Sequence, residues 1–387
     1  MKKNIAIFFY GLGDFSGGGG AERFFAGFLK DYQQSSSNLF KLSLLTDRGS
    51  FEQLKKVINQ DLLQNVYLFK VISNRFKYSF EFAQILFLLL TQRIQAIQVP
   101  LYGSYYFPLI KKIDSLPGWI RPKIIIIITD SFLPYYYFNT ENKKYDFKSI
   151  FGRLFEEVRI DAIISWYELF DEFATKYKII KSNPIIHVIK SRYTTKIFDN
   201  SIIKKNNIIF ASRLTEAKKP LMFLDAIKLL KQRGVVLNNW RFLIYGKGEL
   251  EQKIKDEIFK YNLNDIVFIN FAPDLTMVMS ESKCFVSTMD YENFPSLSMN
   301  EAMAAGNAII ARNVGQTHLF VRHMKNGILI EPDNTEGLSN AIEYFIKHPE
   351  MHETMALESI RLTKTEHTFK NFKFQMEGFW SEILNVK

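Results

Sequence analysis

The sequence predicts an α/β protein made of two Rossmann-like domains that face each other across a cleft. Short apolar segments of strand length alternate with amphipathic segments of helix length along the whole chain. This alternation is interrupted by a polar, basic stretch at residues 190–206 and then starts afresh. A length of 387 residues also suits two domains better than a single core.

The first half contains segments with the composition of buried strands. Five consecutive isoleucines at 124–128 are typical of a strand covered on both faces, as in a parallel sheet between helices. We therefore expect residues 1–200 to form a first Rossmann-like domain. Its expected strands are Ile5–Phe9, Leu42–Thr46, Val66–Phe69, Ala96–Val99, Ile124–Ile128, Ala162–Ser165 and Ile185–Ile189.

The second half repeats the pattern over residues 201–368, which we expect to form a second Rossmann-like domain. A last helix over 369–387 could cross back to the first domain. The expected strands are Ile208–Ala211, Arg241–Tyr245, Ile266–Ile269, Cys284–Ser287, Ala308–Ala311 and Gly327–Ile330. The expected helices are Pro220–Arg233, Leu250–Tyr261, Ser296–Ala305, Glu336–Lys347, Pro349–Lys364 and Phe369–Leu384.

The positive charge is uneven. The net charge is +10, and residues 1–200 carry 27 Lys+Arg against 18 Asp+Glu. A positive first half fits an anionic membrane face, an anionic substrate or nucleic acid, and plain solubility charge is the alternative. Aromatic residues such as those at 135–137 lack an interleaved basic stripe, which argues against nucleic acid.

The single cysteine, Cys284, excludes a disulfide framework and a thiolate metal cluster. No segment reaches the roughly 18 apolar residues that span a bilayer. The longest candidate, Phe80–Leu90, contains Glu81 and Gln84. We therefore expect a cytoplasmic protein that at most rests on the inner face of the cell membrane through its first domain.

Glycines gather after the first expected strand. Four stand in a row at 17–20, and Gly19 and Gly20 lie directly before the first helix. Without Cβ atoms, backbone amides in such a turn can approach an anion at a helix N-terminus. The dinucleotide fingerprint G-x-G-x-x-G is not met, because Ser16 occupies its third glycine position. The turn predicts a phosphate site, and a surface loop is the alternative.

Two cations follow the first strand of the second half. Arg213 and Lys218 lie between this strand and Pro220, a residue suited to the first turn of a helix. An arginine fork and a lysine point charge at a strand end make a fitting clamp for a diphosphate. A solvated basic loop has the same spacing.

A third loop follows the strand that contains Cys284. Pro295 and Ser296 begin a helix there, and free amides near 295–297 would face a phosphate. Glu301, one turn on, could accept both hydroxyls of a ribose. Ser298 and Glu301 also have capping-box spacing, so a structural role for Glu301 is the alternative.

Other chemistries lack their motifs. The six histidines show no metal-ligand spacing, and there is no D-x-D pair, G-x-S-x-G elbow or Walker lysine loop. We therefore expect no metal and no cofactor besides a donor substrate.

Together these loops resemble the large retaining glycosyltransferase family often called family 4, the glycosyl transferases group 1. Its fold of two facing Rossmann domains is known as GT-B, and the resemblance implies that residues 1–200 bind the acceptor and residues 201–368 bind the nucleotide-sugar donor. The similar segments are the Gly19-Gly20-Ala21-Glu22 loop, Ala211–Leu214 with Lys218, the Gly246-Lys247-Gly248 turn, and Glu301–Gly306. Each is unspecific alone, but their order and intervals together are specific to the family.

The resemblance implies residue roles. Arg213 and Lys218 would stabilise the leaving diphosphate, Glu292 would lie near the transferred sugar, and Asp130 would belong to the catalytic group. The implied donor-binding residues are Gly19, Gly20, Gly246, Gly248, Asn293, Phe294, Pro295, Ser296, Leu297 and Glu301.

Two features depart from the family pattern. The family usually has seven residues between its two glutamates, whereas eight separate Glu292 from Glu301 and Asn293 occupies the seven-residue position. Many members have His-Asp after the central strand of the first domain, and here that place reads Ile128-Thr129-Asp130.

The resemblance implies a metal-independent hexosyltransferase that retains anomeric configuration. Its donor would be a nucleoside-diphosphate sugar, with uracil expected as the base, and its acceptor a glycan or lipid-linked precursor of a cell-surface polysaccharide or glycoconjugate. The alternatives are a non-catalytic nucleotide-sugar-binding subunit or regulator, an NAD-dependent oxidoreductase, and an inverting transferase or epimerase of the same architecture.

Overall fold

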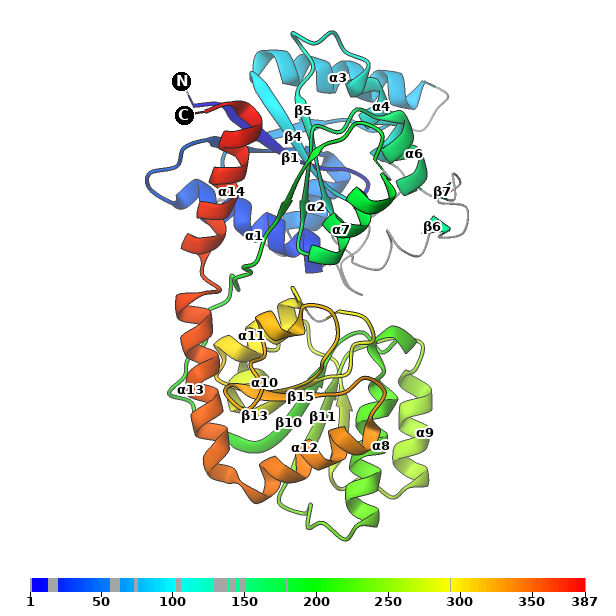
Figure 1. Cartoon of the computed structure of the whole chain (residues 1–387), viewed down its shortest axis with the longest axis vertical. Coiled ribbons are helices and arrows are strands. Elements are labelled where there is room, and N and C mark those ends of the chain that lie inside the picture. Colours follow the sequence, from blue (N-terminus) through cyan, green and yellow to red (C-terminus); the bar gives the residue numbers. More distant parts are fainter. Residues whose placement is uncertain are drawn as a thin grey trace. The chain divides into compact units, whose positions relative to one another are not determined.

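The fold is seen in a computed structural model (Figure 1), whose described residues divide into two compact units. The first unit holds residues 2–190 together with 369–386, and the second holds 191–368. The structure describes residues 2–12, 20–55, 63–72, 76–101, 106–128, 138–139, 144–145, 150–178, 180–292 and 294–386.

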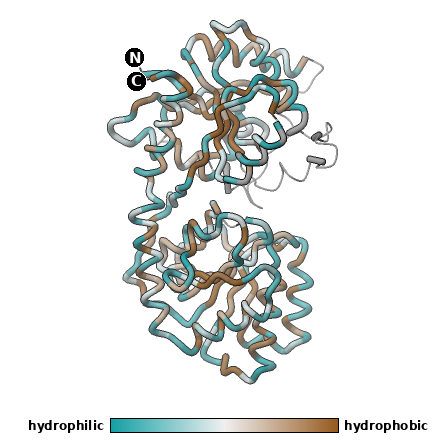
Figure 2. Tube along the Cα trace, in the orientation of Figure 1, coloured by the Kyte–Doolittle hydropathy of each residue, from teal (hydrophilic) through white to brown (hydrophobic). Residues whose placement is uncertain are grey.

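The first unit is built on a seven-stranded parallel sheet with the order β3-β2-β1-β4-β5-β8-β9. All seven strands expected in the first half lie in it. The isoleucine run in β5 is buried, and Figure 2 shows this hydrophobic centre in brown. The strands are β1 (Asn4–Phe9), β2 (Lys41–Asp47), β3 (Val66–Phe69), β4 (Ile94–Leu101), β5 (Lys123–Ile128), β8 (Ala162–Ser165) and β9 (Ile185–Val188).

Helices cover this sheet, and a short antiparallel pair, β6 (Phe138–Asn139) and β7 (Lys144–Tyr145), stands outside it. The helices are α1 (Gly20–Gln34), α2 (Arg48–Lys55), α3 (Lys77–Thr91), α4 (Phe107–Asp114), α6 (Ile150–Glu157), α7 (Glu168–Tyr177) and α14 (Phe369–Leu384).

The C-terminal helix α14 belongs to the first unit because its aromatic side chains pack there. The rings of Phe28 on α1 and Phe372 on α14 meet edge-on at 4.9 Å. The indole of Trp380 donates a buried hydrogen bond of 2.9 Å to Gln98 Oε1 on β4. Apolar contact and one satisfied polar group thus fix the last helix on the sheet that begins the chain.

The second unit is a six-stranded parallel sheet with the order β12-β11-β10-β13-β14-β15. Every strand expected in the second half is present. The strands are β10 (Lys205–Ala211), β11 (Arg241–Tyr245), β12 (Val267–Asn270), β13 (Ser282–Ser287), β14 (Ala308–Arg312) and β15 (Gly327–Ile330). With the first sheet, they confirm the predicted pair of Rossmann-like domains.

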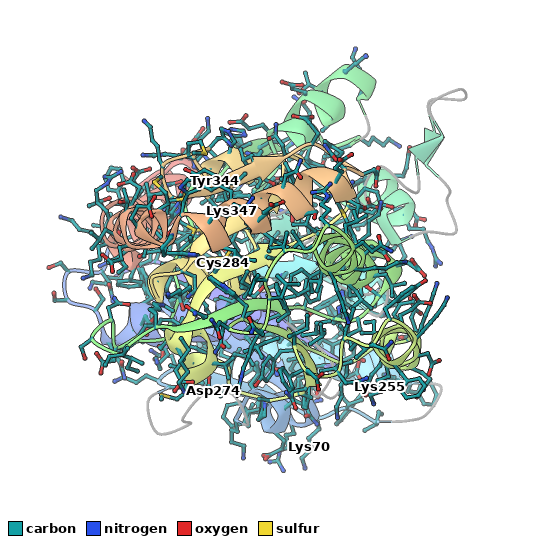
Figure 3. All side chains as sticks on the ribbon, turned by 90° about the horizontal axis from the view of Figure 1, so that it is seen from below. Lys70, Lys255, Asp274, Cys284, Tyr344 and Lys347 are labelled. Atoms are coloured by element: carbon teal, nitrogen blue, oxygen red, sulfur yellow. The ribbon has the colours of Figure 1, made fainter. Side chains whose placement is uncertain are left out.

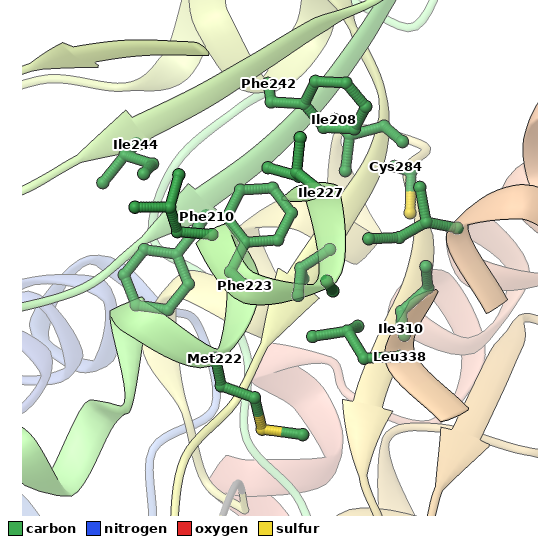
Figure 4. Packing of buried hydrophobic residues seen from close by; sticks show 14 of the residues in the cluster. Ile208, Phe210, Met222, Phe223, Ile227, Phe242, Ile244, Cys284, Ile310 and Leu338 are labelled. Atoms are coloured by element: carbon green, nitrogen blue, oxygen red, sulfur yellow. The ribbon is translucent and has the colours of Figure 1, made fainter. Parts of the chain in front are cut away.

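Helices lie on both faces of this second sheet. One face packs against α8 (Pro220–Gln232), α9 (Glu251–Lys260) and α12 (Thr335–Lys347). Figure 4 shows Phe210 and Phe223 stacked in that core beside Cys284. The other helices are α10 (Thr276–Glu281), α11 (Leu297–Ala304) and α13 (Pro349–Thr365), and two 3₁₀ turns lie at Glu216–Lys218 and Thr317–Leu319.

The unit boundary lies at Lys190–Ser191, ten residues before the predicted 200/201 division. The intervening segment is fastened to the second unit. The amide of Asn300 on α11 donates to the carbonyl of Arg192, and the buried ammonium of Lys204 donates to the carbonyl of Ala305. Polar contacts with α11 therefore move this connecting segment out of the first unit.

Charged and apolar side chains separate as expected for a globular fold. Figure 3 places Lys255 and Lys347 at the outside of the second unit, whereas the thiol of Cys284 is buried. Burial raises the pKa of this thiol, so it is an inert core residue. Within the described ranges, none of the helices has the length and apolarity to cross a bilayer.

Candidate functional site

The chain order reverses between β10 and β13, which are neighbours in the second sheet. In an open parallel sheet, the loops at the carboxyl ends of the strands diverge at such a point, and ligands bind there. Three of the sequence-predicted segments follow β10, β11 and β13, so the topology brings them to this edge.

The loop after β10 exposes Arg213 and buries its neighbour Leu214. The backbone of this loop is held by β11 and the turn after it, because Ser212 N–H donates to Tyr245 O (3.1 Å) and Leu214 N–H to Lys247 O (2.9 Å). Among the described residues, the guanidinium of Arg213 has no ion-pair or hydrogen-bond partner. The backbone of the loop is thus fixed, and the guanidinium at the strand end has no partner among the described residues.

The glycines of the turn after β11 have a packing role. A Cβ at Gly246 would lie 1.9 Å from the carbonyl oxygen of Ser212, and a Cβ at Gly248 would lie 2.3 Å from that of Leu214. Only glycine permits this approach of two backbones. Both residues therefore position the Arg213 loop. Their contact with a donor stays a prediction.

Lys218 ends the 3₁₀ turn that precedes α8, and its neighbour Lys219 has a left-handed backbone with φ of 45°. The hydroxyl of Thr288, just after β13, donates to the carbonyls of Lys218 (2.7 Å) and Lys219 (2.8 Å). The predicted clamp loop is thereby tied to the strand across the reversal point.

An ion-pair network around the buried Arg312 holds these strand-end loops together. Arg312, at the end of β14, is 1% exposed and donates to Asp290 Oδ1 at 2.7 Å. Lys219 Nζ lies 2.8 Å from the same oxygen, and both cations also contact Asp333. Burial opposes ionisation of Asp290, but hydrogen bonds from Lys219 and Arg312 outweigh it and lower its pKa.

Sequence reasoning missed this network. One signal was available, because Arg312 is a charged residue at the end of an otherwise apolar strand. Its partners Asp290 and Asp333 come from two different loops, and their meeting is a property of the folded sheet alone.

Glu292 is engaged with backbone amides. Its carboxylate accepts hydrogen bonds from Phe294 N–H (2.9 Å) and from Gln316 N–H (2.8 and 2.9 Å to its two oxygens). Gly315 makes room for it, since a Cβ there would lie 2.0 Å from Oε2, and φ of 50° also favours glycine. The carboxylate therefore joins the loops after β13 and β14, and its approach to a sugar stays a prediction.

The segment 294–297 leads into α11. The ring of Phe294 is buried against Phe320, with centroids 4.9 Å apart, so its side chain anchors the loop. Pro295 follows a cis peptide bond. Ser296 is the N-cap, and its hydroxyl accepts from Met299 N–H at 3.3 Å.

The first amides of α11 are open. Among the described residues, the N–H groups of Leu297 and Ser298 donate to no protein acceptor. These donors and the positive end of the helix dipole have the chemistry that an anion requires, and anion binding here stays a prediction.

Glu301 lies on α11 and is nearly buried. Its carboxylate oxygen Oε2 is 3.5 Å from the ammonium of Lys196, which also pairs with Asp274 at 3.0 Å. Burial raises the pKa of Glu301, and the charge of Lys196 opposes that rise. No pattern in the sequence pointed to Lys196, which lies far earlier in the chain than Glu301.

The alternative of a capping box at Glu301 is wrong. The N-cap of α11 is Ser296 rather than Ser298, and Glu301 is directed to Lys196 instead of to the start of the helix. Contact of Glu301 with a ribose stays a prediction.

Three predicted site residues, Gly19, Asp130 and Asn293, lie outside the described residues. Gly20 is the first residue of α1. Within the described part of the chain, no group of three or more His, Cys, Asp or Glu residues has the arrangement of a metal site.

Comparison with known families matches residues 194–360 to the family described as Glycosyl transferases group 1. This segment covers the whole sheet of the second unit and every site loop described above.

Two curated relatives illustrate the similarity. The UDP-Gal:alpha-D-GlcNAc-diphosphoundecaprenol alpha-1,3-galactosyltransferase of Escherichia coli is 26% identical over 145 residues, 36% of this chain and 37% of that protein. The poly(glycerol-phosphate) alpha-glucosyltransferase of Bacillus subtilis is 22% identical over 363 residues, 86% of this chain and 53% of that protein. The chain thus spans about a third to a half of these relatives.

Among solved structures, Anabaena Alr3699/HepE in complex with UDP superimposes with a TM-score of 0.71 at 16% identity, covering 98% of this chain and 100% of that one. At this identity the likeness concerns the fold. Residues 194–360 thus match the glycosyl transferases group 1 family, and the two parallel sheets together with this likeness give the chain the GT-B fold.

Proposed function

We propose that this chain is a glycosyltransferase that moves a sugar from a UDP-sugar to a glycan or lipid-linked acceptor, with retention of anomeric configuration. The observation that carries the proposal is the pairing of an exposed, unpartnered Arg213 with the open amides of Leu297 and Ser298 at one reversal point of a parallel sheet. All three groups are donors suited to a diphosphate.

In this reaction these donors would stabilise the leaving group, a nucleoside diphosphate. As the bond between the anomeric carbon and the β-phosphate oxygen breaks, negative charge builds on that phosphate. Arg213, Lys218 and the α11 amides would stabilise this charge, because these positive groups are already in place before the reaction. Glu301 would accept the ribose hydroxyls and so align the diphosphate with the cations.

The names of similar proteins support the donor and acceptor classes. Anabaena Alr3699/HepE was solved with UDP, and the Escherichia coli relative is named for UDP-Gal and a diphosphoundecaprenol-linked acceptor. We therefore propose a UDP-sugar donor and an acceptor that is lipid-linked or polymeric, in cell-surface glycan synthesis. Retention rests on the family resemblance.

A thermal-shift screen tests the donor site. UDP at 100 times its dissociation constant should stabilise the fold by about 2.7 kcal/mol, a shift of a few degrees for a chain of this size. GDP and ADP at the same concentration should give smaller shifts. Arg213→Ala should abolish the UDP shift and lower donor turnover by about 10²-fold, as loss of one fixed donor does.

Arg241 supplies the matched control. It is an exposed arginine at the amino end of the neighbouring strand β11, and Arg241→Ala should keep the UDP shift. A UDP shift unchanged by Arg213→Ala would refute the site. UDP binding without transfer to any acceptor would refute the catalytic function and leave a binding subunit. NMR of the product's anomeric proton decides between retention and inversion.

A further inference from the structure

Three consecutive backbone carbonyls just before α8 accept hydrogen bonds from the segment that follows β13. The hydroxyl of Thr288 donates to the carbonyls of Lys218 (2.7 Å) and Lys219 (2.8 Å). The N–H of Asp290 donates to the carbonyl of Ala217 at 3.1 Å. One short segment therefore holds the backbone of the whole turn that carries Lys218.

Thr288 has the central place in this contact. Its side chain is fully buried, and its hydroxyl has a single hydrogen, which the two carbonyls share. Burial of a backbone carbonyl is costly unless a donor pairs with it. The hydroxyl of Thr288 thus orients two successive peptide groups, one of which belongs to Lys218.

The segment that holds the turn is itself held by β14. The guanidinium of Arg312 donates to the carbonyls of Thr288 (3.3 Å) and Met289 (3.4 Å) and to Asp290 Oδ1 (2.7 Å). Arg312 is 1% exposed, and a buried cation requires such acceptors. The place of Thr288 is therefore fixed by a strand of the sheet rather than by a mobile side chain.

The lysine next to Lys218 completes the attachment. Lys219 Nζ pairs with Asp290 Oδ1 at 2.8 Å and also with Asp333. Hydrogen bonds to these two carboxylates raise the pKa of Lys219, so its charge is held within the protein. Of the two adjacent lysines, Lys219 thus has a structural role as a fixed end of the turn.

The direction of the carbonyls matters for an anionic ligand. A carbonyl oxygen carries partial negative charge and repels a phosphate. Because the carbonyls of 217–219 point to Thr288 and Asp290, these oxygens are directed to the protein. The turn can then bring the positive charge of Lys218 to a diphosphate without opposing dipoles.

We propose that Thr288 is a positioning residue of the donor site, whose shared hydrogen bond sets the place of Lys218 against the β-phosphate of a UDP-sugar. The inference rests on the proposed function, because it concerns the same diphosphate site. Thr288 acts through Lys218 rather than by contact with the donor, since its own side chain is fully buried.

A comparison of UDP with UMP isolates this role. UMP lacks the β-phosphate, so its binding does not depend on the place of Lys218. Fixed charges stabilise a phosphate only when they are already correctly placed, and a small displacement weakens the contact strongly. A displaced Lys218 therefore lowers UDP affinity and leaves UMP affinity unchanged, whereas general damage to the unit lowers both.

Isothermal calorimetry with the full chain tests the proposal. Thr288→Val removes the hydroxyl and keeps the side-chain shape, and it should weaken UDP binding about tenfold, the scale of one charge-assisted hydrogen bond. UMP affinity should not change. Thr288→Ser should keep the affinity of wild type for UDP. Thr288→Cys, whose thiol is a weak donor, should fall between the two and serves also if the valine variant does not fold.

A double-mutant cycle shows whether Thr288 acts through Lys218. Lys218→Ala alone should weaken UDP binding about tenfold or more. Addition of Thr288→Val to Lys218→Ala should then cause no further loss, because the group that Thr288 positions is already gone. A merely structural role of Thr288 predicts that the two losses add.

Ser282 supplies the matched control at the other end of the same strand. It is buried at the start of β13, and its hydroxyl donates to the carbonyl of Val278 at 2.7 Å. Ser282→Ala should lower the free energy of unfolding in urea, as Thr288→Val does. Its affinities for UDP and UMP should remain those of wild type.

The outcomes separate this inference from the proposed function. Unchanged UDP affinity in Thr288→Val beside a weakened Lys218→Ala would overturn the positioning role alone. Equal losses for UDP and UMP, or additive losses in the double variant, would do the same. Failure of wild type to bind UDP would instead overturn the donor site of the proposed function, and the positioning role with it.

Discussion

The two parallel sheets end their central strands in opposite ways. After β1, Gly11 N–H donates to Asp47 at 3.0 Å, and the Tyr10 hydroxyl donates to buried Glu81 at 3.0 Å. After β10, Arg213 is exposed and its guanidinium has no partner among the described residues. The first edge uses these polar groups to hold the fold, and the second presents its cation to solvent.

The difference shows that a strand end is not a site by position alone. Both edges lie where the strand order reverses, between β1 and β4 in one sheet and between β10 and β13 in the other. A ligand needs polar groups that the protein has left without partners. The comparison predicts that damage to the first edge lowers stability, whereas damage to the second lowers nucleotide binding.

The largest effect should come from the turn that supports Arg213. Gly248→Ala would force a Cβ to 2.3 Å from the Leu214 carbonyl, and overpacking of this kind costs about 3 kcal/mol. Urea unfolding should show this loss of stability, together with a weaker UDP shift. Gly118→Ala in the first unit is the control, because nothing lies within 4 Å of its Cβ. Equal stability of the two variants would contradict the packing role.

At the first edge, Tyr10→Phe should cost about 1–3 kcal/mol and leave UDP binding unchanged, because it removes a buried partner of Glu81. Burial already raises the pKa of Glu81 and the Tyr10 bond opposes this, so the variant raises it further.

The pH dependence follows from the sign of that shift. A carboxyl whose folded pKa is raised binds its proton more tightly in the folded state, so stability is retained at low pH and lost as pH rises through the folded pKa. Urea unfolding of Tyr10→Phe at pH 5 and pH 7 should therefore show the larger cost at pH 7. Addition of Glu81→Leu should restore stability. A loss of UDP affinity in Tyr10→Phe would break the proposed contrast between the edges.

At the second edge, Lys196→Met should raise the pKa of Glu301, because it removes the cation that opposes the effect of burial. If ionised Glu301 accepts the ribose hydroxyls, UDP affinity at pH 7 should fall several-fold, because a larger share of Glu301 is then protonated. Affinity should recover as pH rises. Isothermal calorimetry between pH 6 and pH 9 measures this.

Lys205 offers a control of the same type. It pairs with Glu281 at 2.6 Å in the same unit, and Lys205→Met should leave the pH dependence of UDP binding unchanged. A pH-independent affinity in Lys196→Met would rule out Glu301 as the ionised ribose ligand.

The smallest effect concerns a histidine away from both edges. Burial lowers the pKa of His352 to about 4, although its bond to the carbonyl of Phe345 at 2.9 Å opposes this. The unfolded chain then binds more protons below pH 6.5, so stability is lost as pH falls from about 6.5 to 4. We expect a contribution of about 1–2 kcal/mol at pH 5.

His352→Phe should remove that part of the acid sensitivity without affecting UDP binding, as seen by urea unfolding at pH 7.5 and pH 5. His318→Phe, at an exposed position, is the control. An equal loss of unfolding free energy between pH 7.5 and pH 5 in wild type and His352→Phe would show that other groups dominate acid unfolding.

Local patterns were enough to predict the strands. Apolar runs such as those of β5 and β13 are buried on both faces, and the composition of such a run is enough to predict this burial. The short helix α10 and the small β6–β7 pair were missed, because elements of this length carry too little periodicity. Arg213 was correctly placed at a strand end, since its position depends only on where β10 stops.

Contacts between distant segments escaped prediction. The partner of Glu301 is Lys196, and the partners of Arg312 are Asp290 and Asp333; they meet through the order of strands in the sheet. Capping-box spacing suggested Ser298 as the cap of α11, but the N-cap of this helix lies two residues earlier, at Ser296.

By itself the sequence determined the two parallel sheets, their strands and the loops that follow them, because these depend on periodicity and local conformation. Tertiary structure alone decided which polar groups have a hydrogen-bond or ion-pair partner within the protein. It turned Glu81 of α3 inward to Tyr10 and left Phe87 outside, although both belong to one apolar run. The physical reason is that hydrogen-bond satisfaction and burial are properties of pairs brought together by folding.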